Sequence, residues 1–193
     1  MTWPSRELDA LFGTPTGAGV TRAALQRLID DQVPESEVID FQGRPVHDPP
    51  KSRTWSGEAE FAKDVASFAN HRGGVIVYGV TEKPSGVAGE LTPINPKIGI
   101  DGEERWCGQA LRNCLAPPVD VEYLPVDAGS DGWFLLIVVP RSRRGPHAVL
   151  DPDDSSAPLR YPVRHGGQTR WLDEHEVAAR YRRRESGSRN PPQ

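Results

Sequence analysis

The chain has 193 residues, of which 36% are hydrophobic and 26% are charged, and its formal net charge is −4. This length suits one domain with extensions. No stretch approaches the roughly 20 apolar residues of a membrane helix, and no apolar run follows the first residues as in a secretory leader, so we expect a cytoplasmic protein. Cys107 and Cys114 lie seven residues apart on a predicted helix, which is too far for a disulfide bond, and two cysteines give a zinc site little support.

The N-terminal segment is predicted to be helical. Apolar residues recur at helical spacing in 21–31, and Thr21 is a suitable N-cap for that helix. A shorter helix is expected at 5–12, joined to the second by a glycine- and proline-rich linker. These two helices form an N-terminal extension over residues 1–32, whose role the sequence leaves open.

The next part of the chain predicts a strand, a helix and a second strand. Val38-Ile39-Asp40-Phe41 is expected to be a short strand, followed by a long loop over 42–55. Ser56 is expected to cap a helix that runs to Asn70. An unbroken apolar run then predicts a buried strand at 74–80, and the proline- and glycine-rich stretch 83–101 is expected to be another loop.

The remaining predicted elements are one helix and four strands, at 103–115, 119–126, 133–139, 159–164 and 168–171. The strand at 133–139 is continuously apolar, so it is expected to be central and buried on both faces. A polar loop is expected over 140–157. The last helix is predicted to start at Asp173, because Asp173 and Glu176 have the spacing of a capping box.

In chain order these elements predict an α+β fold with a mixed, largely antiparallel sheet covered by helices. The main domain is expected to span residues 33–184, and the tail 185–193 is expected to be disordered.

Charge is distributed unevenly along the chain. Residues 141–193 carry 11 arginines and 7 acidic residues, whereas residues 1–140 carry 12 basic and 20 acidic residues. A basic segment on an acidic body is one way to build a phosphate-binding surface. A solvated surface with a charged helix end explains the same composition, so both interpretations stay open.

Four motifs follow one another in a fixed order along the chain. The first is Glu35, followed five residues later by Asp40-Phe41, and the second is a helix ending in Phe68-Ala69-Asn70, then Gly73-Gly74 and a strand that ends in Gly79-Val80. The other two are Pro140-Arg141-Ser142 with Pro146-His147, and Tyr161-Pro162-Val163-Arg164-His165-Gly166 with Trp171-Leu172 after it. These motifs resemble those of the Schlafen AlbA-type domain family, and the resemblance spans roughly residues 33–183. It implies an AlbA-like fold and nucleic-acid binding, with DNA or RNA as the partner and phosphate contacts dominating.

The expected nucleic-acid contacts are mostly arginines of the C-terminal part, namely Arg72, Arg141, Arg143, Arg144, His147, Arg164 and Arg170. We expect Arg164 to be the foremost phosphate contact, with a salt bridge to an acidic residue of the body as the alternative. Arg180, Arg182, Arg183 and Arg184 fall in the last turns of a helix, where cations interact favourably with the helix dipole, so a structural role is expected for them. Asn70, Gly73 and Gly74 are expected to form a structural turn, although Asn70 in a ligand contact stays open.

A second hypothesis is a metal-dependent endoribonuclease. In members of the family that cleave RNA, three acidic residues converge, and the matching residues here are Glu35, Asp40 and Glu82. Such carboxylates would hold Mg²⁺ or Mn²⁺, and the cation would activate water. The chain departs from the family pattern at Thr81, where an acidic residue is usual, and at Gln42, where a lysine is usual.

The third hypothesis is a nucleotide-binding or protein-interaction regulatory module. The family also carries a divergent AAA, or ATP-binding, label, but a P-loop needs the pattern G-x-x-x-x-G-K-[ST], and the nearest spacing, Gly74 to Gly79, lacks the lysine. No cofactor is therefore assigned. Exposed strand edges in a small mixed sheet would suit a homodimer.

Overall fold

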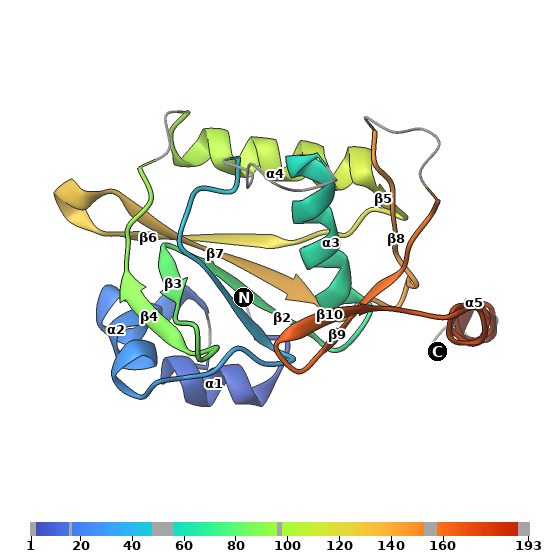
Figure 1. The fold of residues 1–193 in the computed structure, drawn as a ribbon, viewed down its shortest axis with the longest axis horizontal. Helices are drawn as coiled ribbons and strands as arrows, with labels where there is room; N and C mark the ends of the chain where they lie inside the picture. Colours follow the sequence, from blue (N-terminus) through green and yellow to red (C-terminus); the bar gives the residue numbers. More distant parts are fainter. Residues whose placement is uncertain (1–2, 16, 48–55, 96–97, 153–157, 189–193) are drawn as a thin grey trace.

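The computed structural model describes residues 3–15, 17–47, 56–95, 98–152 and 158–188 (Figure 1). Its central sheet has four strands in the order β1-β2-β7-β6: β1 (Ile39–Gln42), β2 (Gly73–Tyr78), β7 (Trp133–Pro140) and β6 (Glu122–Asp127). Strands β1 and β2 are parallel, and the other two pairs are antiparallel. The predicted α+β class with a mixed, mostly antiparallel sheet is confirmed.

Helices cover both faces of this sheet and create two hydrophobic cores. Helices α3 (Gly57–Ala69) and α4 (Ile100–Cys114) pack on one face, whereas α1 (Arg6–Phe12) and α2 (Arg22–Asp30) pack on the other. Side chains of a strand alternate between faces, and β7 shows this clearly. Leu135, Ile137 and Val139 enter the first core, and Phe134, Leu136 and Val138 enter the second, so β7 is central and buried on both faces as predicted.

The helix starts follow their capping residues. The Thr21 hydroxyl accepts a hydrogen bond from the amide of Ala24 at 3.3 Å, and the Ser56 hydroxyl accepts one from the amide of Ala59 at 3.2 Å. Asp173 and Glu176 exchange two hydrogen bonds, of 3.1 and 2.8 Å, at the start of α5 (Glu174–Ser188). These predicted caps are confirmed.

Two expected loops contain strands. Within 83–101 the strand β4 (Ala88–Leu91) pairs with β3 (Val80–Glu82) as a hairpin, and within 140–157 the two-residue strand β8 (Ala148–Val149) pairs with β5 (Leu115–Ala116). Strands this short, in sequence rich in glycine and proline, carry too few residues for an alternating pattern to be recognised. Two short 3₁₀ turns are also present: Gly17–Gly19 lies between α1 and α2, and Gly129–Asp131 lies between β6 and β7.

The C-terminal part forms a hairpin and a helix. Strands β9 (Pro162–His165) and β10 (Gln168–Trp171) pair antiparallel, and α5 lies beyond them at one edge of the molecule (Figure 1). Helix α5 runs to Ser188, so residues 185–188 are helical where a disordered tail was expected. The rest of that tail, 189–193, and residues 48–55 of the long loop lie outside the described residues. Among the described helices, none combines the length and apolar character needed to cross a membrane.

Candidate nucleic-acid interface

The turn between α3 and β2 brings the end of that helix against the end of β7. Gly73 has φ +79°, and a Cβ atom there would lie 2.6 Å from the carbonyl oxygen of Val139 and 2.6 Å from the amide nitrogen of Arg141. A Cβ atom on Gly74 would lie 2.4 Å from the ring of Phe68. Only glycine fits at either position, because a side chain would collide with backbone or with a buried ring.

Asn70, at the C-terminal end of α3, is the centre of a buried hydrogen-bonded clamp. Its side-chain amide donates to the carbonyl oxygens of His147, at 2.9 Å, and Pro162, at 2.8 Å, and its oxygen accepts from the amide of His147 at 2.7 Å. The residue is 3% exposed. The amide group is fully used in joining α3, the loop before β8 and strand β9, which is a structural role and not a ligand contact.

Replacing Asn70 by alanine is expected to lower the free energy of unfolding by about 3 kcal/mol, because three buried backbone groups lose their partners. Chemical denaturation measures this loss. Asn113→Ala is the control, since Asn113 makes an exposed hydrogen bond to Glu58 and should change stability by less than about 0.5 kcal/mol. Equal effects of the two substitutions would contradict the clamp.

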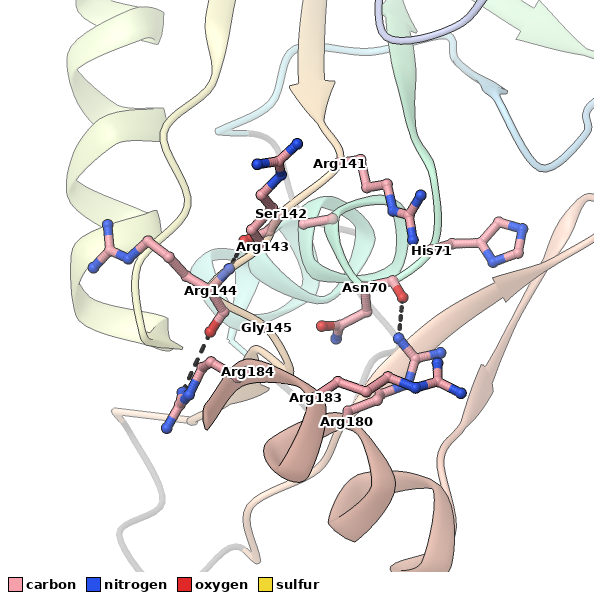
Figure 2. A pocket seen from close by; sticks show the side chains of 11 residues that line it. Asn70, His71, Arg141, Ser142, Arg143, Arg144, Gly145, Arg180, Arg183 and Arg184 are labelled. Carbon is pink, nitrogen blue, oxygen red and sulfur yellow. Dashed lines mark hydrogen bonds between the residues drawn. The ribbon is translucent and has the colours of Figure 1, made fainter. Parts of the chain in front are cut away.

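A cleft of about 850 Å³ opens beside this turn (Figure 2). We call it the arginine cleft, and its lining consists of Ala69, Asn70, His71, Arg141, Ser142, Arg143, Arg144, Gly145, Arg180, Arg183 and Arg184. The loop after β7 supplies three of the arginines, and helix α5 supplies the other three. In Figure 2 the α5 arginines lie below the turn that carries Asn70, and the loop arginines lie above and to the left.

Among the described residues, no acidic side chain is paired with the six guanidinium groups of the arginine cleft. No Asp or Glu lines the cleft, and none of the six forms an ion pair with a carboxylate in the part of the chain that the structure describes. Five of them are exposed, and Arg180 is half-buried. Burial lowers the pKa of Arg180, and the charges of Arg183 and Arg141 add to that lowering against the opposing effect of Glu176. The cleft therefore concentrates positive charge.

Backbone carbonyls, and not carboxylates, hold the helix side of the cleft. Arg180 donates a hydrogen bond to the carbonyl oxygen of Asn70, and Arg184 donates one to the carbonyl oxygen of Arg144 at 3.3 Å. The Arg184 guanidinium also lies 4.8 Å from the ring centroid of Tyr181. These contacts place α5 against the loop while the cationic charge stays available to an anion.

The structure divides the predicted contact residues into two groups. Arg141, Arg143 and Arg144 share the arginine cleft. The predicted set missed Arg180, Arg183 and Arg184, which were interpreted through the helix dipole alone. Their spacing of i, i+3 and i+4 places three cations on one face of a helix, and this is the signal that would have indicated a joint surface.

Three other predicted contacts are engaged elsewhere. Arg72 forms an exposed ion pair with Glu7 at 2.8 Å, and Arg170 forms a bidentate pair with Glu176 at 2.6 and 2.7 Å. Arg170 thereby lowers the pKa of Glu176 to about 2. His147 is 1% exposed, and its Nδ1 contacts the carbonyl oxygen of Pro117 at 2.7 Å, so the expected contact of His147 with a ligand is corrected to a buried structural role.

Arg164, the foremost expected phosphate contact, is a buried structural arginine. It is 4% exposed, and its guanidinium lies 2.6 Å from Asp40 and 3.8 Å from Glu35. It also donates to the carbonyl oxygens of Ser36, at 3.1 Å, and Ile39, at 3.4 Å. Its donors are thus directed at the protein, and the alternative of a salt bridge to an acidic residue of the body describes this residue correctly.

The three acidic residues of the nuclease hypothesis do not fit a metal ion. Burial and the neighbouring charge of Asp40 raise the pKa of Glu35 to about 8, and its Oε1 accepts a hydrogen bond from the amide of Phe41 at 2.9 Å. Asp40 is paired with Arg164, whereas Glu82 is exposed on β3. Among the residues with described positions, no group of three His, Cys, Asp or Glu is arranged to hold a metal.

The fold and the site define the class of protein. It is an α+β domain with a mixed sheet, a glycine turn at Gly73-Gly74 and a cationic cleft beside that turn. The family described as Schlafen, AlbA_2 matches residues 35–173, which is well over half of the chain, and the protein belongs to this family. No curated protein matches the chain.

Two solved structures match the chain at low sequence identity. The DIP2311 protein from Corynebacterium diphtheriae is 17% identical with a TM-score of 0.48, and the match covers 92% of this chain and 31% of that protein, so our chain spans about a third of its length. The N-terminal domain of a RecG-related protein from Nitrosomonas europaea is also 17% identical with a TM-score of 0.48, over 78% of this chain and 93% of that domain.

Proposed function

We propose that this protein binds nucleic acid through the phosphate backbone, with the arginine cleft as the contact surface. The observation that carries the proposal is the gathering of six guanidinium groups from two segments with no carboxylate among the lining residues. Membership of the Schlafen AlbA_2 family supports the general role of nucleic-acid binding. DNA and RNA both present the phosphates that this surface would contact.

Arginine suits this role because its planar guanidinium donates two parallel hydrogen bonds to phosphate oxygens. The acidic balance of residues 1–140 favours the same site, since a polyanion is repelled by negative charge and attracted to the arginine cleft. Binding of this kind releases counterions, so the affinity should fall steeply as the salt concentration rises.

The test compares Arg183→Ala with Arg182→Ala. Both arginines are exposed on α5, but only Arg183 lines the arginine cleft. Fluorescence anisotropy with a short labelled DNA, offered as a duplex and as a single strand at several salt concentrations, gives the affinity and its salt dependence. Arg183→Ala should weaken binding about tenfold, or ~1.4 kcal/mol, and reduce the slope of log K against log salt by about one.

Arg182→Ala should leave both quantities close to those of the wild type. If the two variants lose affinity equally, the attraction comes from the general charge of α5 and not from the cleft. If the wild-type protein binds neither form of the DNA, nor the matching RNA, the proposed function is wrong.

A further inference from the structure

Among the residues that the structure describes, the lining of the arginine cleft contains no Phe, Tyr or Trp. Its one ring belongs to His71, whose Nε2 lies 3.0 Å from Glu37 Oε2. Proteins that hold single-stranded nucleic acid combine a basic groove with aromatic side chains on which unpaired bases stack, and each stacked base contributes about 1–3 kcal/mol. The cleft has the basic groove without the stacking surface.

The aromatic residues that lie beside the cleft in the sequence do not supply that surface. Phe68, which precedes Ala69, is fully buried. Tyr161 and Tyr181 pack edge to face, with ring centroids 6.3 Å apart and hydroxyl oxygens 3.2 Å apart. Arg184 covers the ring of Tyr181, and the guanidinium of Arg160 lies 4.0 Å from the ring centroid of Trp171. These are the three aromatic residues of the described segments 141–152 and 158–188, and all of them are already in contact with another side chain.

The neutral polar side chains of the lining are also poorly suited to reading base edges. The amide of Asn70 uses both of its hydrogens and its oxygen within the protein. The Ser142 hydroxyl accepts a hydrogen bond from the amide of Arg144 at 3.0 Å. The free donors of the cleft are therefore mainly guanidinium groups, which match phosphate oxygens.

The size of the cleft matches the sugar-phosphate backbone of one nucleic-acid strand. A volume of 850 Å³ corresponds to an edge of about 9–10 Å. The rise of ~3.4 Å per phosphate is measured along the duplex axis, and neighbouring phosphates of one strand lie roughly twice as far apart, so such a cleft holds about two phosphates. The three loop arginines and the three α5 arginines then give about three guanidinium groups per phosphate.

We propose that the arginine cleft binds one backbone of a double-stranded nucleic acid, whose bases stay paired with the complementary strand, and that it does so without sequence preference. This inference rests on the proposed function and adds the class of nucleic acid to it. A duplex backbone is ordered before binding, so the protein need not supply the ordering free energy that a flexible single strand requires.

The experiment measures anisotropy with a short mixed-sequence DNA duplex and with an unstructured oligothymidylate of the same length, at equal phosphate concentration and salt. We expect the duplex to bind at least tenfold more tightly than oligothymidylate. A second duplex of unrelated sequence should bind within about twofold of the first. Arg183→Ala should weaken duplex binding, and Arg182→Ala should not.

Each outcome separates the inference from the proposed function. Oligothymidylate binding as tightly as the duplex would overturn the duplex inference while the nucleic-acid function stands. A large difference between the two duplexes would overturn the absence of sequence preference. Binding of neither probe would overturn the proposed function itself.

Discussion

Replacing Arg164 by leucine is expected to lower the free energy of unfolding by about 3–5 kcal/mol, the loss typical of removing one partner of a buried ion pair. The Arg164 side chain is 3% exposed, and its removal leaves the Asp40 carboxylate, itself 7% exposed, without its cationic partner. Two backbone carbonyls, of Ser36 and Ile39, also lose a donor. Chemical denaturation measures the change. For a domain of ordinary stability this loss is a large fraction of the total.

The matched control is Arg143→Leu, which removes an exposed arginine of the arginine cleft and should change stability by less than about 0.5 kcal/mol. A second variant, Arg164→Leu combined with Asp40→Leu, removes both charges and should recover part of the lost stability. If Arg164→Leu alone keeps wild-type stability but weakens nucleic-acid binding, Arg164 contacts the ligand and its structural role is wrong.

The second large effect concerns pH. The pKa of Glu35 is raised in the folded protein from its ordinary value of 4.5 to about 8, first by burial and then by the charge of Asp40. Between these two values the folded protein holds a proton that the unfolded chain has released, so stability falls as the pH rises through this window. The total loss is on the order of 2–4 kcal/mol and is complete above about pH 8.

Glu35→Gln should abolish most of this loss, because the glutamine carries no charge and its oxygen still accepts a hydrogen bond from the amide of Phe41. The variant should therefore be more stable than the wild type at pH 9 and similar to it near pH 5. Denaturation midpoints measured across the range test this. The pKa of Asp64 is raised to about 6, chiefly by burial, so the comparison between about pH 6 and 8 reports mainly on Glu35.

Glu82→Gln is the control for the pH experiment. Glu82 is exposed and contributes only one of the weaker charges that raise the pKa of Glu35. In the Glu82→Gln variant, the free energy of unfolding should fall with rising pH nearly as it does in the wild type. An unchanged slope in Glu35→Gln would show that another group is responsible.

Much of the fold could be predicted from the sequence, because local signals and tertiary packing agree. The caps at Thr21, Ser56 and Asp173 each precede an apolar helical pattern, and the structure begins a helix at each of them. The continuously apolar run in β7 predicts a strand buried on both faces, and both cores receive its side chains. The short pairs β3–β4 and β5–β8 could not be predicted, since their pairing is decided by the neighbours that the fold supplies.

The candidate site was predicted less completely, because the sequence does not show which charges are paired. Arg164 and Arg141 carry the same group, but the first is buried on strand β9 against Asp40 and the second lies on an open loop. Arg183 is distant from Arg141 in sequence, and only the docking of α5 beside the β7–β8 loop brings both to one cleft. Side-chain type alone gives no information on either point.

Helix α5 meets the rest of the protein partly through main-chain oxygen atoms, since Arg180 bonds to the carbonyl of Asn70 and Arg184 to that of Arg144. Every amino acid brings the same carbonyl oxygen. The residue at position 144 can therefore change during evolution without loss of the helix attachment, provided that the loop keeps its path. The attachment and the cationic character of the loop are thus separable, and natural variants of this domain can alter their ligand affinity through loop residues while retaining the same architecture.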